Sequence, residues 1–154
     1  MTYEPSTGVI EVVASDRESR AEMAQFLARD LLGIDFHSEK VPLRQYDLSV
    51  LLNSFNFPTD LEDGIERVDV RQLRLMPLDA IGERVTLECT SKADRTIWSM
   101  AADRLGTGNP LGGGWVVTQA KLAIKFHPKG DARRGRTLPL TITYPHGCNL
   151  KDQT

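Results

Sequence analysis

Hydrophobic and polar positions recur along the chain with the periods of strands and helices in turn. Residues 8–14 are rich in β-branched side chains, which predicts a strand. A helix is expected next, because Ser15 and Glu18 have the spacing of a capping box. Its apolar side chains recur every three or four positions up to Gly33, a residue that suits a left-handed helix end.

The middle of the chain predicts two strands and a second helix. Residues 65–76 alternate between apolar and polar, and the alternation slips by one position at Arg71 and Gln72, which predicts a β-bulge. Residues 83–90 alternate without a slip and predict a further strand. Residues 94–105 place their apolar side chains on one helical face.

The last third of the chain predicts a long β-hairpin over residues 115–144. Apolar and polar side chains alternate in both of its arms, 115–127 and 137–144. Because Pro139 has no N–H to donate to a neighbouring strand, the arm at 137–144 is expected at an edge of the sheet.

Together these elements predict an α+β fold, with a mostly antiparallel sheet and helices on one of its faces. Without an extra helix capped by Asp47 and the C-terminal edge strand, the order is βαββαβ, the order of ferredoxin-like folds. The length suits a single domain over residues 1–154. Residues 1–7 and 146–154 are expected to be flexible tails.

Composition narrows the class of protein. The hydrophobic fraction of 40% argues against wholesale disorder, and no apolar run approaches the ~20 residues that cross a bilayer. The first residues lack the basic start and apolar stretch of a signal peptide. Two distant cysteines, Cys89 and Cys148, make no disulfide framework, so a cytoplasmic location is expected.

Charge divides the chain into an acidic and a basic part. From Trp115 onward there are seven basic and two acidic residues, a net charge of +5, whereas the preceding part carries 12 basic and 19 acidic residues, or −7. The candidate nucleic-acid-binding residues are the basic side chains of the predicted hairpin: Lys121, Lys125, Lys129, Arg133, Arg134 and Arg136. A basic β-ribbon can follow a phosphate backbone. The same charges can also protect an exposed strand from aggregation, or pair with the acidic part of the chain or with an acidic partner.

Two kinds of binding site are disfavoured: a surface that stacks nucleic-acid bases and a glycine-rich loop that binds phosphate. The polar face of the predicted hairpin has no interleaved aromatic side chain for base stacking, and the candidate central strands lack the aromatics of an RNA-recognition module. The glycine-rich segment 106–114 follows a helix and precedes a strand, the reverse of a phosphate-binding loop. This segment predicts a flexible connection between helix and strand, with a mobile lid as the alternative.

His127, His146 and Cys148 are weak candidates for catalysis, with Cys148 as nucleophile and a histidine as base. A structural zinc site needs four ligands, usually in two close pairs, so no metal and no other cofactor is predicted. The acidic run of Asp60, Glu62, Asp63, Glu66 and Asp69 straddles a loop and the start of the strand at 65–76, and it is interpreted as a solvated loop.

The sequence therefore favours a non-catalytic binding module over an enzyme, with nucleic acid as its leading ligand. Two alternatives stay open. One is a small enzyme with a site near His127, His146 and Cys148. The other is a subunit or domain of a larger assembly, or a homo-oligomer, that binds through the edge strand 137–144. No membrane partner is expected.

Overall fold

The computed structural model describes residues 1–35, 45–60, 62–130 and 133–152. The chain forms two compact units, Met1–Leu43 and Arg44–Thr154. The prediction of a single domain over residues 1–154 stays a prediction, since the structure defines each unit by itself.

The first unit contains a two-stranded sheet and a helix. β1 (Thr2–Glu4) and β2 (Val9–Glu11) are antiparallel, with Tyr3 opposite Ile10. α1 (Arg17–Asp30) begins after Asp16, whose Oδ2 accepts a hydrogen bond of 2.7 Å from the Ser19 N–H. The predicted cap at Ser15 is therefore wrong by one position, because the Asp16 carboxylate takes the free amide.

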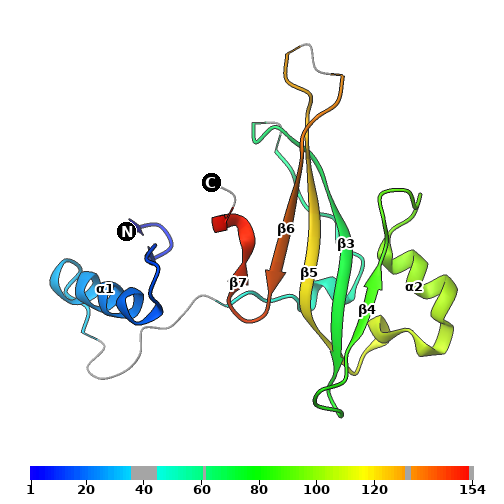
Figure 1. The fold of residues 1–154 in the computed structure, drawn as a ribbon, viewed down its shortest axis with the longest axis horizontal. Helices are drawn as coiled ribbons and strands as arrows, with labels where there is room; N and C mark the ends of the chain where they lie inside the picture. The colour runs from blue at the N-terminus through cyan, green and yellow to red at the C-terminus, as the bar shows by residue number, and fades with distance from the viewer. Residues whose placement is uncertain (36–44, 61, 131–132, 153–154) are drawn as a thin grey trace. The chain divides into compact units, whose positions relative to one another are not determined.

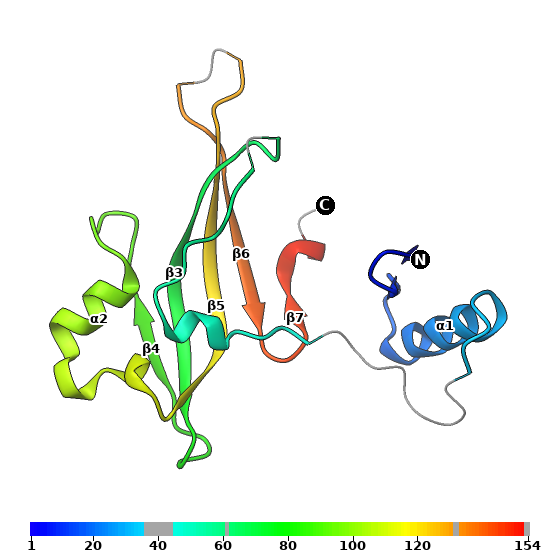
Figure 2. The ribbon, with the colours of Figure 1, turned by 180° about the vertical axis from the view of Figure 1, so that it is seen from behind.

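The second unit is built on a five-stranded antiparallel sheet with the order β4-β3-β5-β6-β7 (Figure 1). Its strands, in chain order, are β3 (Ile65–Pro77), β4 (Val85–Glu88), β5 (Trp115–Phe126), β6 (Thr137–Thr143) and β7 (Gly147–Cys148). α2 (Ile97–Leu105) and a short 3₁₀ helix (Ser49–Leu52) pack against one face of this sheet, the face that Figure 2 brings forward.

The core of this unit lies between that sheet face and the helices. Leu73, Leu75 and Ile97 are fully buried, at 0% exposure each. The indole Nε1–H of Trp98 donates to the Leu51 carbonyl at 2.9 Å, which joins α2 to the 3₁₀ helix. The buried apolar residues around these are Leu48, Leu51, Val70, Leu87, Cys89, Ala101, Val117, Ala120, Leu122 and Leu140.

The α+β class with a mostly antiparallel sheet is confirmed. The ferredoxin-like order is not confirmed, because β2 pairs with β1 in a sheet of its own. The predicted bulge in residues 65–76 is confirmed, since the register of β3 against β5 shifts between Val70 and Gln72. No helix in the part of the chain that the structure describes is long and apolar enough to cross a membrane.

The two ends of the chain, expected to be flexible tails, contain secondary structure. β1 lies in the first of them, and β7 and a 3₁₀ helix (Asn149–Asp152) lie in the second. Residues 153 and 154 lie outside the described residues.

Candidate functional site

The predicted hairpin is formed by β5 and β6, which pair from Gln119 opposite Thr143 to Lys125 opposite Thr137. The Phe126 N–H donates to the Arg136 carbonyl at 2.9 Å and closes the neck of the connecting loop. Beyond this neck the loop extends past the ends of the neighbouring strands (Figures 1 and 2). The described part of the loop therefore presents its side chains away from the core.

Gly135 makes this neck tight. A Cβ atom placed on Gly135 would overlap the carbonyl oxygen of Phe126, far inside the 3.0 Å below which Cβ atoms are essentially never found. Only a residue without a side chain fits against that carbonyl. Gly135 therefore sets the position of the basic residues on either side of it, a role that was not predicted from the sequence.

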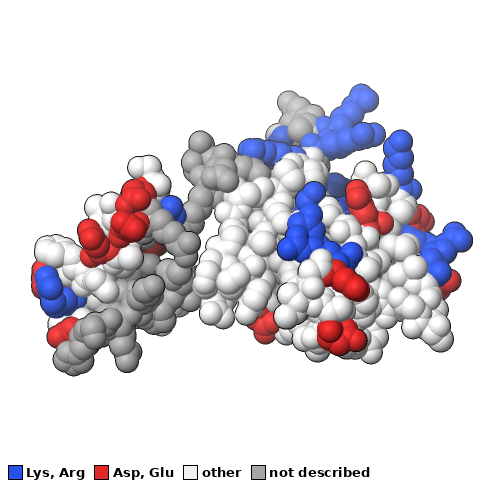
Figure 3. All heavy atoms as spheres, turned by 60° about the horizontal axis from the view of Figure 1, so that its bottom comes forward, with Lys and Arg blue, Asp and Glu red and all other residues white. Residues whose placement is uncertain are grey.

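Five of the six candidate basic residues are exposed. Lys121 lies on β5, Lys129, Arg133 and Arg134 lie on the loop, and Arg136 lies at its neck. Within residues 1–35, 45–60, 62–130 and 133–152, no ion pair engages any of these five side chains. Figure 3 shows Lys and Arg side chains projecting at the top of the view, and others lower down beside Asp and Glu.

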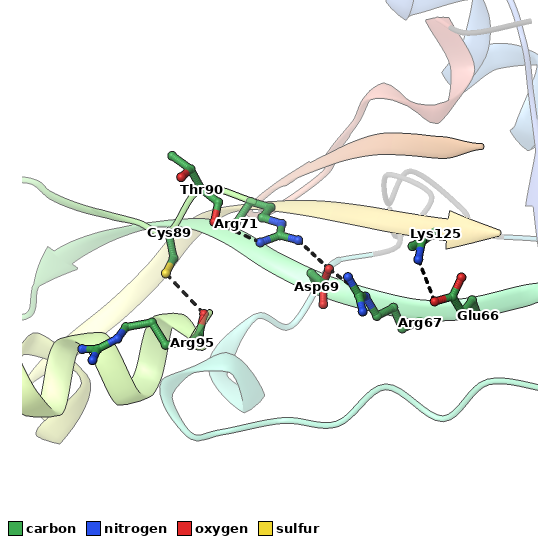
Figure 4. Close-up of polar contacts among 8 residues, drawn as sticks. All are labelled: Glu66, Arg67, Asp69, Arg71, Cys89, Thr90, Arg95 and Lys125. Atoms are coloured by element: carbon green, nitrogen blue, oxygen red, sulfur yellow. Dashed lines mark hydrogen bonds and ion pairs between the residues drawn. The ribbon is translucent and has the colours of Figure 1, made fainter. Parts of the chain in front are cut away.

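Lys125, the sixth candidate, is held by an acidic partner. Its Nζ lies 2.7 Å from Oε1 of Glu66, on the neighbouring strand β3 (Figure 4). The hydrogen bond from Lys125 holds the pKa of the Glu66 carboxyl below its ordinary value, against the opposing effect of desolvation. Lys125 therefore contributes less free positive charge than its five neighbours.

A row of alternating charge runs along β3. Arg67 and Arg71 both donate to Oδ2 of Asp69, and Arg71 also donates to the Thr90 carbonyl at 3.3 Å (Figure 4). Glu66 and Asp69 lie on β3, within the strand predicted over residues 65–76, and both form ion pairs, so the interpretation of these two residues as part of a solvated loop is wrong. The spacing of Arg67, Asp69 and Arg71, two positions apart on a strand, was the signal for this row.

The three catalytic candidates are not brought to one place. Cys148 lies opposite Ile142 on β6, which in turn lies opposite Ala120 on β5. His127 follows Ala120 by seven positions, which corresponds to roughly 23 Å along a strand. Cys148 also packs against the core, whereas His146 is exposed. The sheet register thus separates His127 from Cys148.

The described residues offer no cluster of three or more His, Cys, Asp or Glu side chains that could hold a metal ion. The glycine-rich segment contains two short 3₁₀ turns, Gly106–Gly108 and Pro110–Gly112, between α2 and β5. It starts at the carboxyl end of α2, where the helix dipole is negative and disfavours a phosphate group.

A groove of about 590 Å³ lies beside the charged row of β3. It is lined by the segment 54–59, by β3 from Glu66 to Arg71, and by Arg95, Thr96 and Trp98. The groove was not predicted from the sequence, because its walls come from segments whose proximity depends on the tertiary fold.

Comparisons of the chain with protein-family models, with curated proteins and with solved structures found no match. Function must therefore be inferred from the site alone.

Proposed function

We propose that the unit Arg44–Thr154 is a non-catalytic binding module that contacts nucleic-acid phosphates through the β5–β6 hairpin. The observation that carries the proposal is the group of five exposed basic side chains with no ion pair in the described structure: Lys121, Lys129, Arg133, Arg134 and Arg136. Three of these cations lie on the projecting loop, Arg136 lies at its neck and Lys121 lies on β5. Exposed cations of this kind can release counterions from a phosphate backbone.

The form of the hairpin supports contact with the backbone rather than with bases. A two-stranded ribbon fits the major groove of B-form DNA, and arginines near its turn can reach phosphates on either side. The polar face of β5 carries Gln119, Lys121, Ala123 and Lys125 and offers no aromatic ring for stacking. We therefore expect binding with little sequence preference.

The test is a fluorescence-anisotropy titration with single- and double-stranded DNA and RNA at roughly 50 and 200 mM salt. The full chain is compared with the triple variant Arg133→Ala/Arg134→Ala/Arg136→Ala. We expect micromolar or tighter binding by the full chain that weakens steeply with salt. Removing three phosphate-binding charges lowers the slope of log K against log salt by up to about 2.7 for duplex DNA.

A matched control removes the same charge elsewhere on the unit. Arg84, Lys92 and Arg104 are exposed and lie outside the hairpin, so Arg84→Ala/Lys92→Ala/Arg104→Ala should leave affinity and salt slope nearly unchanged. Absence of binding at the lower salt contradicts the proposal. Equal weakening in both triple variants also contradicts it, since binding would then follow net charge rather than the hairpin.

A further inference from the structure

The first half of β3 has a neighbouring strand on one side only. β5 pairs with β3 from Ile65 to Pro77, whereas β4 pairs only with Gln72–Leu75. Among the residues described, neither a strand nor a loop backbone hydrogen bond occupies the other side of β3 between Glu66 and Val70. The sheet therefore has a short open edge at this point.

The hydrogen-bonding pattern of the sheet shows which backbone groups face that edge. The Thr141 N–H donates to Oδ1 of Asn149 at 2.7 Å, so it faces away from β5. In antiparallel pairing, the residue opposite, Lys121, then turns its own backbone groups toward β3. Ala123, two positions further along β5, does the same.

Ala123 lies opposite Asp69 in the β3–β5 register, so the backbone of Asp69 is directed to β5. Its neighbours Val68 and Val70 consequently turn their N–H and C=O groups to the open edge. An extended chain laid along this edge would find donors and acceptors at the spacing of a strand.

The two faces of this edge differ in chemistry. On the core side, Val68 and Val70 lie beside Phe57 and Trp98 in the wall of the groove. On the other side, Arg67 and Arg71 flank Asp69, which leaves one net positive charge in the row. An added strand would place alternate side chains against an apolar and a basic surface.

The opposite edge of the sheet is protected. Pro139 has no N–H, the Thr141 N–H is taken by Asn149, and Thr143 pairs with Gly147 of β7. Strand edges without such protection invite pairing with another chain. The chain protects the β6 edge and leaves the β3 edge open, which points to a partner at β3.

We propose that an extended segment of a partner protein, with alternating apolar and acidic side chains, adds as a strand to the edge of β3 at Arg67–Val70. Register shifts before Arg67 and after Val70 bound this regular stretch and limit the pairing to a short segment. Apolar side chains of the partner contact the half-buried Val68 and Phe57, and its acidic side chains lie near Arg67 and Arg71. The site lies on the side of β3 that faces away from the hairpin strand β5.

Amide hydrogen exchange tests the open edge directly. In the free protein we expect fast exchange at Val68 and Val70 and slow exchange at Asp69, because only the last amide is bonded to β5. Addition of the capped peptide Glu-Val-Glu-Val-Glu-Val should slow exchange at Val68 and Val70 by at least about tenfold. The same peptide, N-methylated at the alternate amides that would face β3, should fail to bind, since it lacks the N–H groups that pair with this edge.

Reversing the charge of Arg67 tests whether the edge of β3 prefers an acidic partner. Arg67→Glu should weaken binding of the acidic peptide and strengthen binding of its Lys-Val counterpart, whereas Arg84→Glu, outside the groove, should change neither. The triple arginine variant of the hairpin should bind the peptide as the full chain does, so failure of the nucleic-acid proposal leaves this one standing.

Three results would overturn the proposal. The first is slow exchange at Val68 and Val70 in the free monomer. The second is binding of the N-methylated peptide as tight as that of the plain one, or no binding of either. The third is protection of the two amides that grows with protein concentration alongside dimer formation in sedimentation, because a second copy would then occupy the edge.

Discussion

Lys125 on β5 and Glu66 on β3 form an ion pair, with Nζ 2.7 Å from Oε1 across 59 positions of sequence. The pair joins the basic hairpin to the acidic part of the chain at one point. It also divides the candidate basic residues into one that has an acidic partner and five that project without one among the described residues.

Replacing Glu66 should make stability depend on pH in a defined direction. Its pKa is lowered in the folded protein, so the stabilisation is present above the ordinary value of 4.5 and is lost as pH falls through the lowered folded value. The free energy of unfolding of Glu66→Gln, measured in urea, should lie below that of the unmodified chain near neutral pH. This difference should shrink below about pH 4.5.

Glu83→Gln removes the same charge from the turn between β3 and β4 and controls for net charge. A difference between Glu66→Gln and the unmodified chain that stays constant down to about pH 3 would show that the Lys125 contact is not its cause.

The ion pair also predicts an unequal contribution of two basic residues to phosphate binding. Lys125→Ala should change the salt slope of nucleic-acid binding less than Arg134→Ala, because Lys125 already has an anionic partner and Arg134 is exposed. For duplex DNA the slope should change by about 0.9 in Arg134→Ala, the value for one phosphate that is no longer neutralised. Equal salt slopes for Lys125→Ala and Arg134→Ala in anisotropy titrations would contradict the expectation that the ion pair with Glu66 reduces the contribution of Lys125.

Gly135→Ala should disturb the neck of the hairpin. The added Cβ would overlap the Phe126 carbonyl oxygen, so the backbone must shift, at a cost of about 1–3 kcal/mol in unfolding free energy. Urea denaturation measures the cost. Gly108→Ala is the control, because a Cβ there meets nothing within 4 Å. Similar stabilities of the two variants would argue against a tight neck.

Burial in the core predicts that two leucines five positions apart contribute very differently to the free energy of unfolding. Leu73 is 0% exposed and Leu78 is 68% exposed. Leu73→Ala should lower the free energy of unfolding by about 2–5 kcal/mol, since it removes buried methyl groups and leaves a cavity. Leu78→Ala should change it by less than about 0.5 kcal/mol. A loss of unfolding free energy in Leu73→Ala as small as that in Leu78→Ala would show that Leu73 is not part of the packed core.

The contact of Asn149 with β6 can be tested by exchange at one amide. Asn149→Ala removes the acceptor of the Thr141 N–H and should speed its exchange with solvent. Asn149→Asp keeps an oxygen at the same position and should retain the protection. Unchanged exchange at Thr141 in Asn149→Ala would mean that another group covers this amide.

Much of the local structure could be predicted from the sequence because it depends on near neighbours. The alternation in residues 115–126 and 137–143 predicted both hairpin arms, and the slip at Arg71 predicted the bulge. Asp47, predicted to cap a short helix, lies one position before the cap residue Leu48, and its side chain accepts the Ser49 N–H at 2.8 Å. These features involve residues a few positions apart, whose contacts follow from backbone geometry.

The pairing of strands could not be predicted in the same way. The strand around Val9–Glu11 has the composition of a central strand but pairs with Thr2–Glu4 in a separate sheet. Likewise, β3 and β4 differ in length, and only the register between them leaves Arg67–Val70 without a second neighbour. Which edges meet depends on packing between distant segments, and side-chain periodicity carries no information about it.

By itself, the sequence determined the periodic elements, the α+β class, and the concentration of positive charge after Trp115, because these follow from local pattern and composition. Only the tertiary structure decided that Glu66 forms an ion pair with Lys125, that His127 and Cys148 lie far apart, and that β3 has an open edge. The physical reason is the same in each case. These relationships are set by strand register and by packing across long sequence separations, and both arise only when the whole core forms.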